Sequence, residues 1–342
     1  VQTCALPIYI VQFFYIHVVY VSFMIAKLHF FLLRQINCQL FIANIGILIW
    51  IIVKNMITLH GMKHIDYTIN VHGRLMDLST PKVMGILNCT PDSFYVGSRK
   101  QTEREILERA TQIVEQGGDI IDIGAFSTRP GAKEVSEEEE TERLRYSLGI
   151  VRHEYPDIPI SVDTYRPLVA RKCIMEWGAD IINDVSEGGI TGIVNTPISE
   201  TGSMFDVVGE LKIPYILMSV KSNLHDMIIA FADEIQQLRD RGAKDIILDP
   251  GFGFGKTLDQ NYAIYAEMEK LQVFELPILV GISRKSMIFK LLDGDPTTSL
   301  NGTTILNTIA LQKGTGILRV HDVKEAIETV KIVSKMRDST QS

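Results

Sequence analysis

Polar side chains stand at the ends of several short apolar runs, and their types suit a small polar ligand. Asp163, Asn183 and Asp249 each follow a run of β-branched residues. A carboxylate accepts two parallel hydrogen bonds, so two carboxylates and an amide facing one pocket would match a flat heterocycle with adjacent N–H donors. The alternative for any one of them is a cap on the following helix. Asp122 and Asp184 are expected to be structural.

Basic side chains stand at the ends of the last two apolar runs. Lys285 follows the seventh run, close to Ser283, and Arg319 and His321 stand at the end of the eighth. Arginine can hold two oxygens of an anion at once. These residues predict an anion site, with one alternative: His321 could be a helix N-terminal residue ahead of Asp322.

Segment 249–257, DPGFGFGKT, ends in the Gly-Lys-Thr of a phosphate-binding loop. The template GxxxxGK[ST] needs a glycine where this chain has Pro250, so the phosphate-loop interpretation fails. A glycine-rich turn that carries Phe252 and Phe254 can instead lay an aromatic wall beside a ligand.

Two further loops, 88–94 and 127–131, are rich in proline, glycine and small polar residues. Their simplest interpretation is a plain turn, but long loops at a catalytic mouth often serve as mobile covers. The four glutamates at 137–140 are expected to form a solvated helix start, where acidic side chains favour the helix dipole.

The chain that carries these residues alternates between short apolar runs and amphipathic stretches. A hairpin is expected over 64–78, with its turn at His72 and Gly73, and strands are expected at 83–87, 119–123, 158–162, 180–182, 215–218, 245–248, 278–281 and 317–320. Helical patterns cover 102–116, 136–154, 167–177, 226–241, 258–271, 303–312 and 323–336. Repeated β/α alternation over about 255 residues predicts a parallel sheet, which closes into a (β/α)8 TIM barrel. A doubly wound open sheet is the alternative, but only a closed sheet brings so many strand ends to one mouth.

Composition limits the classes of function. The 342 residues are 46% hydrophobic and 22% charged with a net charge of −7, which fits a globular domain and argues against nucleic acid as the main partner. The four cysteines show no CxxC and no Cys/His ligand spacing, so neither a disulfide scaffold nor a structural zinc site is expected.

Residues 1–61 differ from the rest of the chain. They contain no acidic residue and include uncharged runs at 6–24 and 40–53. The first run is long enough to cross a bilayer, yet no signal-cleavage pattern follows it. We expect residues 1–61 to be upstream sequence outside the native protein, with Met62 as the start and a barrel domain over 62–342. A membrane anchor is the alternative.

In their order and spacing, seven motifs resemble the dihydropteroate synthases of the pterin-binding barrel family. They are NCTPDSF (88–94), IIDIGAFSTRPGA (120–132), ISVDTY (160–165), ADIINDV (179–185), DPGFGFGKT (249–257), GISRKS (281–286) and LRVHDV (318–323). The resemblance covers residues 62–336. Related pterin-binding methyltransferase barrels share ISVDT and IIND, so FGFGK, SRKS and RVHD carry the distinction.

The resemblance implies a cytoplasmic transferase that joins p-aminobenzoate to 6-hydroxymethyl-7,8-dihydropterin diphosphate, with Mg²⁺ as cofactor. Its partners would be these small molecules and a second copy of itself, with neither nucleic acid nor membrane. On matching positions it assigns the pterin ring to Asp163, Asn183, Asp249 and Lys285. It assigns the diphosphate to Asn88, Thr128, Arg319 and His321, with Asn88 also binding Mg²⁺. The p-aminobenzoate pocket would consist of Phe94, Arg129, Pro130, Phe254, Ser283 and Lys285.

The chain departs from the family pattern in three places. Val96 replaces an acidic loop residue, which leaves the response to sulfonamides and the KM for p-aminobenzoate open. Ser219 stands where the family has histidine, and 187–203 is an expanded loop. The competing functions are a methyl-transferring pterin barrel, which would need a corrinoid partner, and a non-catalytic pterin-binding or membrane-tethered protein.

Overall fold

The chain divides into two units, Val1–Lys63 and His64–Ser342. A computed structural model describes residues 67–89, 99–126, 135–189 and 202–341, all within the second unit. The expectations for residues 1–61 lie outside the described residues. Among the residues described, no helix is both long enough and apolar enough to cross a membrane.

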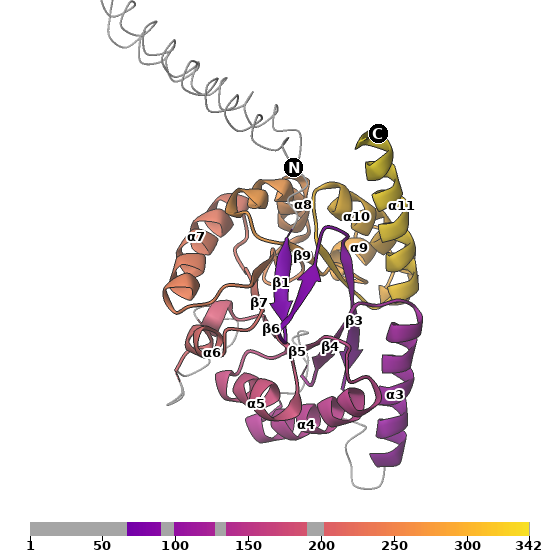
Figure 1. The fold of residues 1–342 in the computed structure, drawn as a ribbon. Coiled ribbons are helices and arrows are strands. Elements are labelled where there is room, and N and C mark those ends of the chain that lie inside the picture. The colour runs from indigo at the N-terminus through magenta and orange to yellow at the C-terminus, as the bar shows by residue number, and fades with distance from the viewer. Residues whose placement is uncertain (1–66, 90–98, 127–134, 190–201, 342) are drawn as a thin grey trace, which may run out of the picture. The chain divides into compact units, whose positions relative to one another are not determined.

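The second unit is a parallel barrel surrounded by helices (Figure 1). Its strands are β3 (Lys82–Asn88), β4 (Ile120–Gly124), β5 (Ile160–Asp163), β6 (Ile181–Asp184), β7 (Tyr215–Met218), β8 (Ile246–Asp249), β9 (Leu279–Val280) and β10 (Ile317–Val320). The strand order is β8-β7-β6-β5-β4-β3-β10-β9, and a parallel bridge between Leu248 and Ile278 joins the two ends. The predicted TIM barrel is confirmed, and the open sheet is not.

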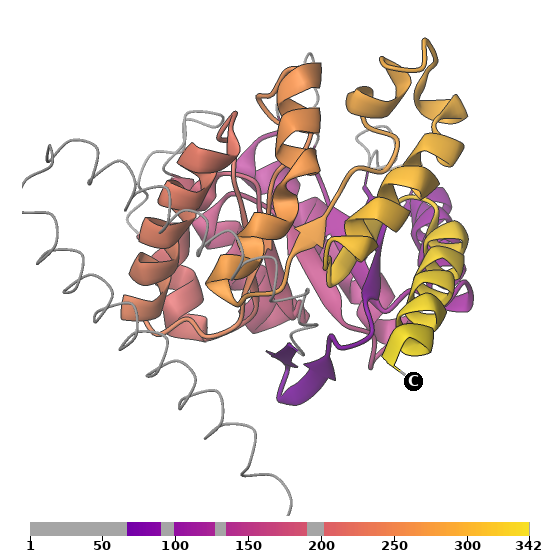
Figure 2. The ribbon, with the colours of Figure 1, turned by 90° about the horizontal axis from the view of Figure 1, so that it is seen from above.

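An antiparallel hairpin closes the bottom of the barrel. β1 (Thr68–Val71) and β2 (Arg74–Asp77) meet at the predicted turn, and Figure 2 shows this indigo hairpin at one end of the strands. Its buried side chains pack on one inward apolar layer of the barrel; that cluster includes Ile69, Val71, Leu78, Met84, Ile120, Ile181, Ile216, Ile247, Leu279 and Ile317. The hairpin therefore seals the amino end of the strands and leaves the carboxyl end for a site.

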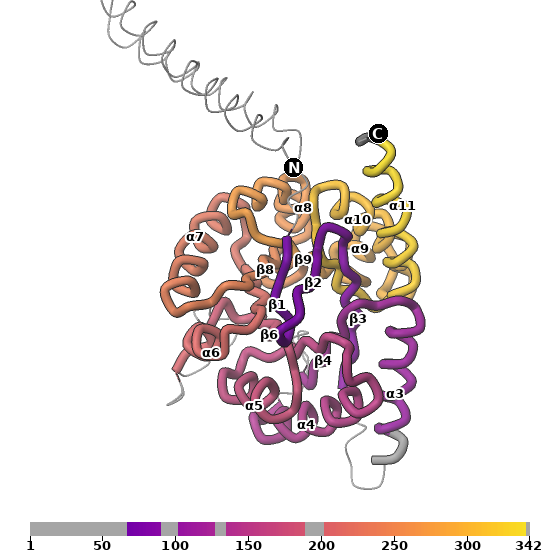
Figure 3. The backbone as a smooth tube through the Cα atoms, viewed as in Figure 1, coloured from indigo at the N-terminus to yellow at the C-terminus, as the bar shows by residue number. Residues whose placement is uncertain are grey.

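Helices cover the outside of the barrel, as the tube in Figure 3 makes visible. They are α3 (Arg99–Glu115), α4 (Glu137–Glu154), α5 (Pro167–Trp177), α6 (Met204–Leu211), α7 (Leu224–Asp240), α8 (Leu258–Ala266), α9 (Ser286–Phe289), α10 (Leu300–Gln312) and α11 (Val323–Gln341). Short 3-10 segments occur at η2 (Glu187–Gly189), η3 (Met268–Phe274) and η4 (Pro296–Thr298).

The helix boundaries follow local signals. Pro167 opens α5 and Gly178, in the left-handed conformation, ends it, so this prediction matches to the residue. The predicted helix over 258–271 is wrong in its second half, because α8 ends at Ala266 and a 3-10 segment continues. Helix α6 was not predicted, although Ser203 and Asp206 form a capping box at its start.

Candidate active site

One inward-facing layer of the barrel is polar on the strands β4, β5, β6, β8 and β10, and it lies two residues beyond the layer closed by the hairpin. Because inward positions recur every second residue, the residue two places after Ile120 is Asp122, and those after Ile247 and Ile317 are Asp249 and Arg319. Asp163 and Asn183 occupy the equivalent places on β5 and β6, where they are register partners. This alternation places five polar side chains at one level below the carboxyl-end mouth of the barrel. We call this level the polar floor; its residues are Asp122, Asp163, Asn183, Asp249 and Arg319.

Arg319 is the central cation of this floor. Its guanidinium donates from Nε to Asp122 Oδ2 at 2.7 Å and from Nη2 to Asp163 Oδ2 at 2.8 Å. Burial alone would lower the pKa of Arg319, but the carboxylates of Asp122 and Asp163 raise it overall. The assignment of Arg319 to the diphosphate stays a prediction; in the structure its guanidinium also pairs with Asp163, a residue assigned to the pterin ring. Asp122 is fully buried and also faces the amide of Asn183 at 3.4 Å.

Asp163 stands in an environment that disfavours its charge. Burial raises its pKa to about 7, Arg319 opposes that shift, and Asp122 adds to it. Its second oxygen, Oδ1, is buried and has no hydrogen-bond partner among the residues that the structure describes. A buried acceptor without a donor is costly, so a ligand with N–H groups at this place would satisfy it.

Asp249 lies on the same floor, at the end of β8. It is 6% exposed, and its Oδ1 accepts a hydrogen bond from the backbone of Gly251 at 2.8 Å. Burial raises the pKa of Asp249, and the nearby charge of Lys285 lowers it. Asp184, by contrast, accepts hydrogen bonds from Tyr215 and from backbone N–H groups, so the expectation of a structural role is confirmed.

Lys285 connects the floor to the glycine-rich turn after β8. Its Nζ donates to the carbonyl of Phe252 at 2.6 Å and lies 4.5 Å from the ring centre of Phe254. Burial lowers the pKa of Lys285 to about 8, against the raising effect of Asp249. Phe254 therefore lies beside a predicted site residue, whereas Phe252 is fully buried and packs on the ring of Tyr265, so the predicted wall of two rings is wrong at Phe252.

Two more predicted residues meet beside this wall. The backbone N–H of His321 donates to Ser283 Oγ at 3.1 Å, and His321 Nδ1 lies 3.1 Å from the same oxygen. Ser283 is 3% exposed. The ends of β9 and β10 are thus tied together at the mouth, where an anion site was predicted.

Asn88 is exposed at the end of β3, opposite Gly124 of β4. A Cβ at Gly124 would lie 3.5 Å from Asp163 Cβ and 3.7 Å from Asn88 Oδ1. Asn88 Oδ1 and Asp163 therefore both lie beside Gly124 of the intervening strand β4.

Phe94, Thr128, Arg129 and Pro130 lie outside the described residues, but the chain on both sides of 127–134 is firmly held. Arg143 Nη1 donates to the carbonyl of Ala125 at 2.9 Å, and Arg166 Nη2 donates to that of Val135 at 2.7 Å. Arg143 is 2% exposed, so this anchor lies in the protein interior. One buried and one partly buried guanidinium group thus hold Ala125 and Val135, on either side of the segment that carries three predicted site residues.

The expectation of a solvated start for α4 is wrong at Glu140. This carboxylate is fully buried, accepts a hydrogen bond from Thr164 at 2.5 Å, and pairs with Arg166. The sequence pattern could not show this, because both partners follow β5 and reach Glu140 from another strand. Glu140 therefore joins the start of α4 to the residues that follow Asp163.

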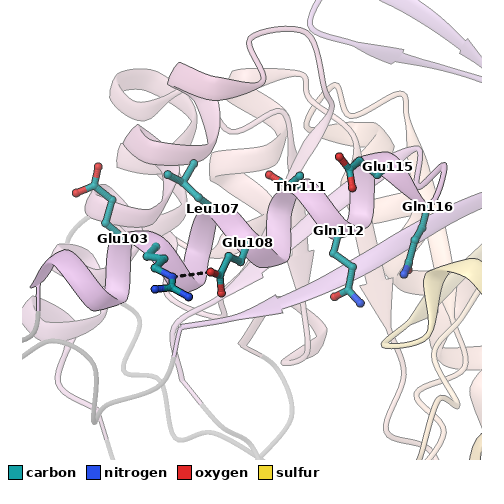
Figure 4. Close-up of a pocket in the computed structure, with 8 residues that line it drawn as sticks. Glu103, Leu107, Glu108, Thr111, Gln112, Glu115 and Gln116 are labelled. Carbon is teal, nitrogen blue, oxygen red and sulfur yellow. Dashed lines mark hydrogen bonds and ion pairs between the residues drawn. The ribbon is translucent and has the colours of Figure 1, made fainter.

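An open hollow lies along the outer face of α3 (Figure 4). Seven of its eight described lining residues come from α3 and the eighth, Gln116, follows that helix directly; an ion pair joins Arg104 and Glu108. A site that performs chemistry needs groups converging from several elements, which the barrel mouth has and this hollow does not.

Comparison with known proteins agrees with this geometry. Residues 84–321 match the family model described as pterin binding enzyme. The chain belongs to the pterin-binding enzyme family. Six of the seven motifs and the polar floor lie within the matched residues, and the seventh motif, 318–323, begins within them.

Relatives within the pterin-binding enzymes are dihydropteroate synthases. The one from Escherichia coli (strain K12) is 39% identical over 276 residues, which cover 76% of this chain and 93% of that one. The one from Bacillus subtilis (strain 168) is 37% identical over 286 residues, covering 80% of this chain and 95% of that one. The chain therefore groups with the dihydropteroate synthases, transferases of folate biosynthesis, as its motifs predict.

Solved structures of dihydropteroate synthases share the fold. That of Yersinia pestis in complex with a sulfonamide drug aligns with a TM-score of 0.70 and 35% identity, covering 80% of this chain and all of that one. That of Xanthomonas albilineans with 4-aminobenzoic acid aligns with a TM-score of 0.70 and 30% identity, covering 80% and 98%.

Proposed function

We propose that this chain condenses 6-hydroxymethyl-7,8-dihydropterin diphosphate with p-aminobenzoate to give 7,8-dihydropteroate and pyrophosphate. The observation that carries this proposal is the convergence of Asp163, Asn183 and Asp249 with Lys285 at one barrel mouth. In the reaction, the aniline nitrogen forms a bond to the pterin methylene carbon. The C–O bond to the diphosphate breaks, and the nitrogen loses a proton.

The acidic and amide side chains bind the pterin ring, and Lys285 with its neighbours lies on the p-aminobenzoate side. Asp163 and Asp249 supply acceptors for the N–H groups of the pterin ring, and Asn183 supplies both a donor and an acceptor. Their buried negative charge also stabilises the positive charge that develops on the dihydropterin as the leaving group departs. No protein nucleophile is needed, because diphosphate is already a good leaving group. Lys285, Phe254 and Ser283 line the side from which p-aminobenzoate attacks.

Mg²⁺ fits the exposed oxygen of Asn88. Mg²⁺ prefers oxygen ligands and usually takes only one or two from the protein, with the rest from water and substrate phosphates. Among the described residues no group of three carboxylate, histidine or cysteine side chains could hold a metal by itself. We propose that Asn88 holds Mg²⁺ together with the diphosphate; the bound ion would supply positive charge to the leaving group.

Asn88→Ala is expected to raise the Mg²⁺ concentration needed for half-maximal activity by about tenfold, because one of few protein oxygens is lost. A magnesium titration of the rate measures this. Asn301→Ala, at an exposed position of α10, is the control and should not move the midpoint. An unchanged midpoint in Asn88→Ala would remove Asn88 from the metal site.

His321→Ala is expected to weaken the binding of the pterin diphosphate and to spare the free pterin. A hydrogen bond to a charged group contributes about 1.5–3 kcal/mol, so an increase in Kd of at least about tenfold is expected for the diphosphate alone. Calorimetry with both ligands measures the difference, and the exposed His225 on α7 offers the matched alanine control. Equal weakening of both ligands would mean that His321 stabilises the barrel rather than binding phosphate.

We further propose a homodimer. Large apolar side chains are exposed on α10 and α11, at Ile305 (50%), Ile332 (63%) and Met336 (54%), and these two helices pack on each other. Exposed apolar side chains on two neighbouring helices are typical of association surfaces. The full chain should sediment as a dimer in analytical ultracentrifugation, and Ile332→Glu together with Met336→Glu should shift it to monomer. A monomeric wild-type chain would contradict the proposal.

Product formation tests the proposed reaction directly. The full chain, given both substrates and Mg²⁺, should release pyrophosphate and form dihydropteroate, and omission of p-aminobenzoate should abolish both. Methyl transfer to a corrinoid in place of this reaction would support the competing function, and pterin binding without turnover would indicate a non-catalytic protein.

A further inference from the structure

The glycine-rich turn after β8 is packed tightly against the end of β7. Gly251 has φ +64°, and a Cβ at this position would lie only 2.2 Å from the carbonyl oxygen of Ser219. Gly253 and Gly255 also have positive φ. Only glycine permits this backbone path. The glycines of the turn therefore allow it to lie this close to the end of β7.

Lys256 holds this contact from within the turn. Its Nζ donates to the carbonyl oxygens of Ser219 at 2.9 Å, Gly251 at 2.9 Å and Phe254 at 3.2 Å. An ammonium has three N–H donors, and here each one has an acceptor. Lys256 is the lysine of the apparent phosphate-loop motif, and its side chain is directed at backbone carbonyls.

The same turn supports the site lysine on its other side. Lys285 Nζ donates to the carbonyl of Phe252 and lies against the ring of Phe254. A Cβ at Gly253 would lie 3.0 Å from Lys285 Cδ, so the turn also sets the path of the lysine stem. Any shift of the turn would therefore move both Phe254 and Lys285.

We propose that Lys256 is a positioning residue: it fixes the turn 250–255 on the end of β7 and so places Phe254 and Lys285 for p-aminobenzoate. This inference rests on the proposed function. The proposed role depends on geometry, because the single Nζ atom of Lys256 must reach carbonyls both in the turn and at the end of β7.

A buried network holds the β7 side of this contact in place. Ser219 Oγ donates to Glu187 Oε1 at 2.9 Å, and the backbone N–H of Val220 donates to the same oxygen at 2.7 Å. Glu187 is fully buried in η2 after β6. The residue that departs from the family pattern, Ser219, thus links the β6 loop to the carbonyl that Lys256 binds.

Charge is the competing explanation for Lys256. It lies near Asp249 and Lys285, and its charge lowers the pKa of both. Arginine separates the two explanations, because it keeps the positive charge but cannot direct three N–H groups from one nitrogen to three carbonyls.

The test compares Lys256→Met, Lys256→Arg and a matched control. Lys313→Met is that control, since Lys313 Nζ also donates to a backbone carbonyl, that of Ala266 at 2.7 Å, and pairs with Glu269. Both Lys256 variants should raise the KM for p-aminobenzoate about tenfold, and the KM for the pterin diphosphate by less than about threefold. The smaller effect on the pterin diphosphate is expected because only two of its four assigned residues, Lys285 and Asp249, contact the turn. Asp163 and Asn183 lie on strands that Lys256 does not contact.

Two results would overturn the proposal. A wild-type KM in Lys256→Arg would show that charge alone suffices, and a lower melting temperature with unchanged KM in Lys256→Met would show a purely structural role. Lys256→Gln, which keeps two N–H donors, takes the place of Lys256→Met where that variant does not fold. If the wild-type chain has no turnover, the proposed function itself fails, and calorimetric binding of p-aminobenzoate with pyrophosphate and Mg²⁺ then gives the same comparison.

Discussion

Asp249→Asn is expected to weaken pterin binding by at least about tenfold, because a hydrogen bond between a buried charge and its partner contributes about 1.5–3 kcal/mol. Asp249 already uses Oδ1 to accept from Gly251. In the variant, the amide oxygen would keep that bond and the NH2 group would face the N–H donors of the ligand. Isothermal titration calorimetry with the free pterin measures the loss.

Asp245→Asn is the matched control, because Asp245 precedes the same strand at its amino end and accepts from the hairpin residue Asn70. This variant should keep wild-type pterin affinity. Wild-type affinity in Asp249→Asn would remove Asp249 from the site, and equal weakening in both variants would indicate a general defect of β8.

Arg319→Ala is expected to lower the free energy of unfolding by about 3–5 kcal/mol, because it leaves two buried carboxylates without their cation. Arg319 is 16% exposed and contacts both Asp122 and Asp163. Urea unfolding at several pH values measures the loss. Arg284→Ala is the control: Arg284 also binds a carboxylate, that of Asp322, but is more exposed at 26%, so a loss of about 1 kcal/mol is expected.

The loss in Arg319→Ala should depend on pH. The folded chain raises the pKa of Asp163 from 3.8 to about 7, so its contribution to stability is complete below 3.8 and is lost as the pH rises through about 7. Without Arg319, the pKa of Asp163 rises further. The loss in free energy of unfolding, relative to wild type, should therefore be larger at about pH 8 than at about pH 5. A pH-independent difference would show that the two carboxylates are not what Arg319 neutralises.

The strands could be predicted because each one carries its own signal. The predictions 215–218 and 317–320 match β7 and β10 to the residue. Apolar runs that end in one polar residue are typical of barrel strands, and the two-residue alternation that turns Asp163 and Asp249 inward is part of the same pattern. The family resemblance then supplied roles that spacing alone left open.

The partners of individual side chains could not be predicted, because they come from distant parts of the chain. Arg319 meets Asp122 across 197 positions of sequence. Glu140 is bound by residues that follow β5, a strand that comes later in the chain. The carbonyls that Lys256 binds come within its reach because the glycines of the turn adopt left-handed backbone conformations. A sequence pattern indicates whether a side chain faces into or out of the barrel. The partner that it meets depends on which distant strands and loops lie next to it.

A crystal structure of the full chain with pteroic acid tests the central claim most directly. The account predicts that the pterin ring lies on the polar floor, with its N–H groups bonded to Asp163 and Asp249 and its edge against Asn183. Asp163 Oδ1, which is buried and finds no donor in the described part of the chain, should gain one from the ligand. A ring bound elsewhere, with Asp163 and Asp249 making only the contacts they make now, would contradict the account.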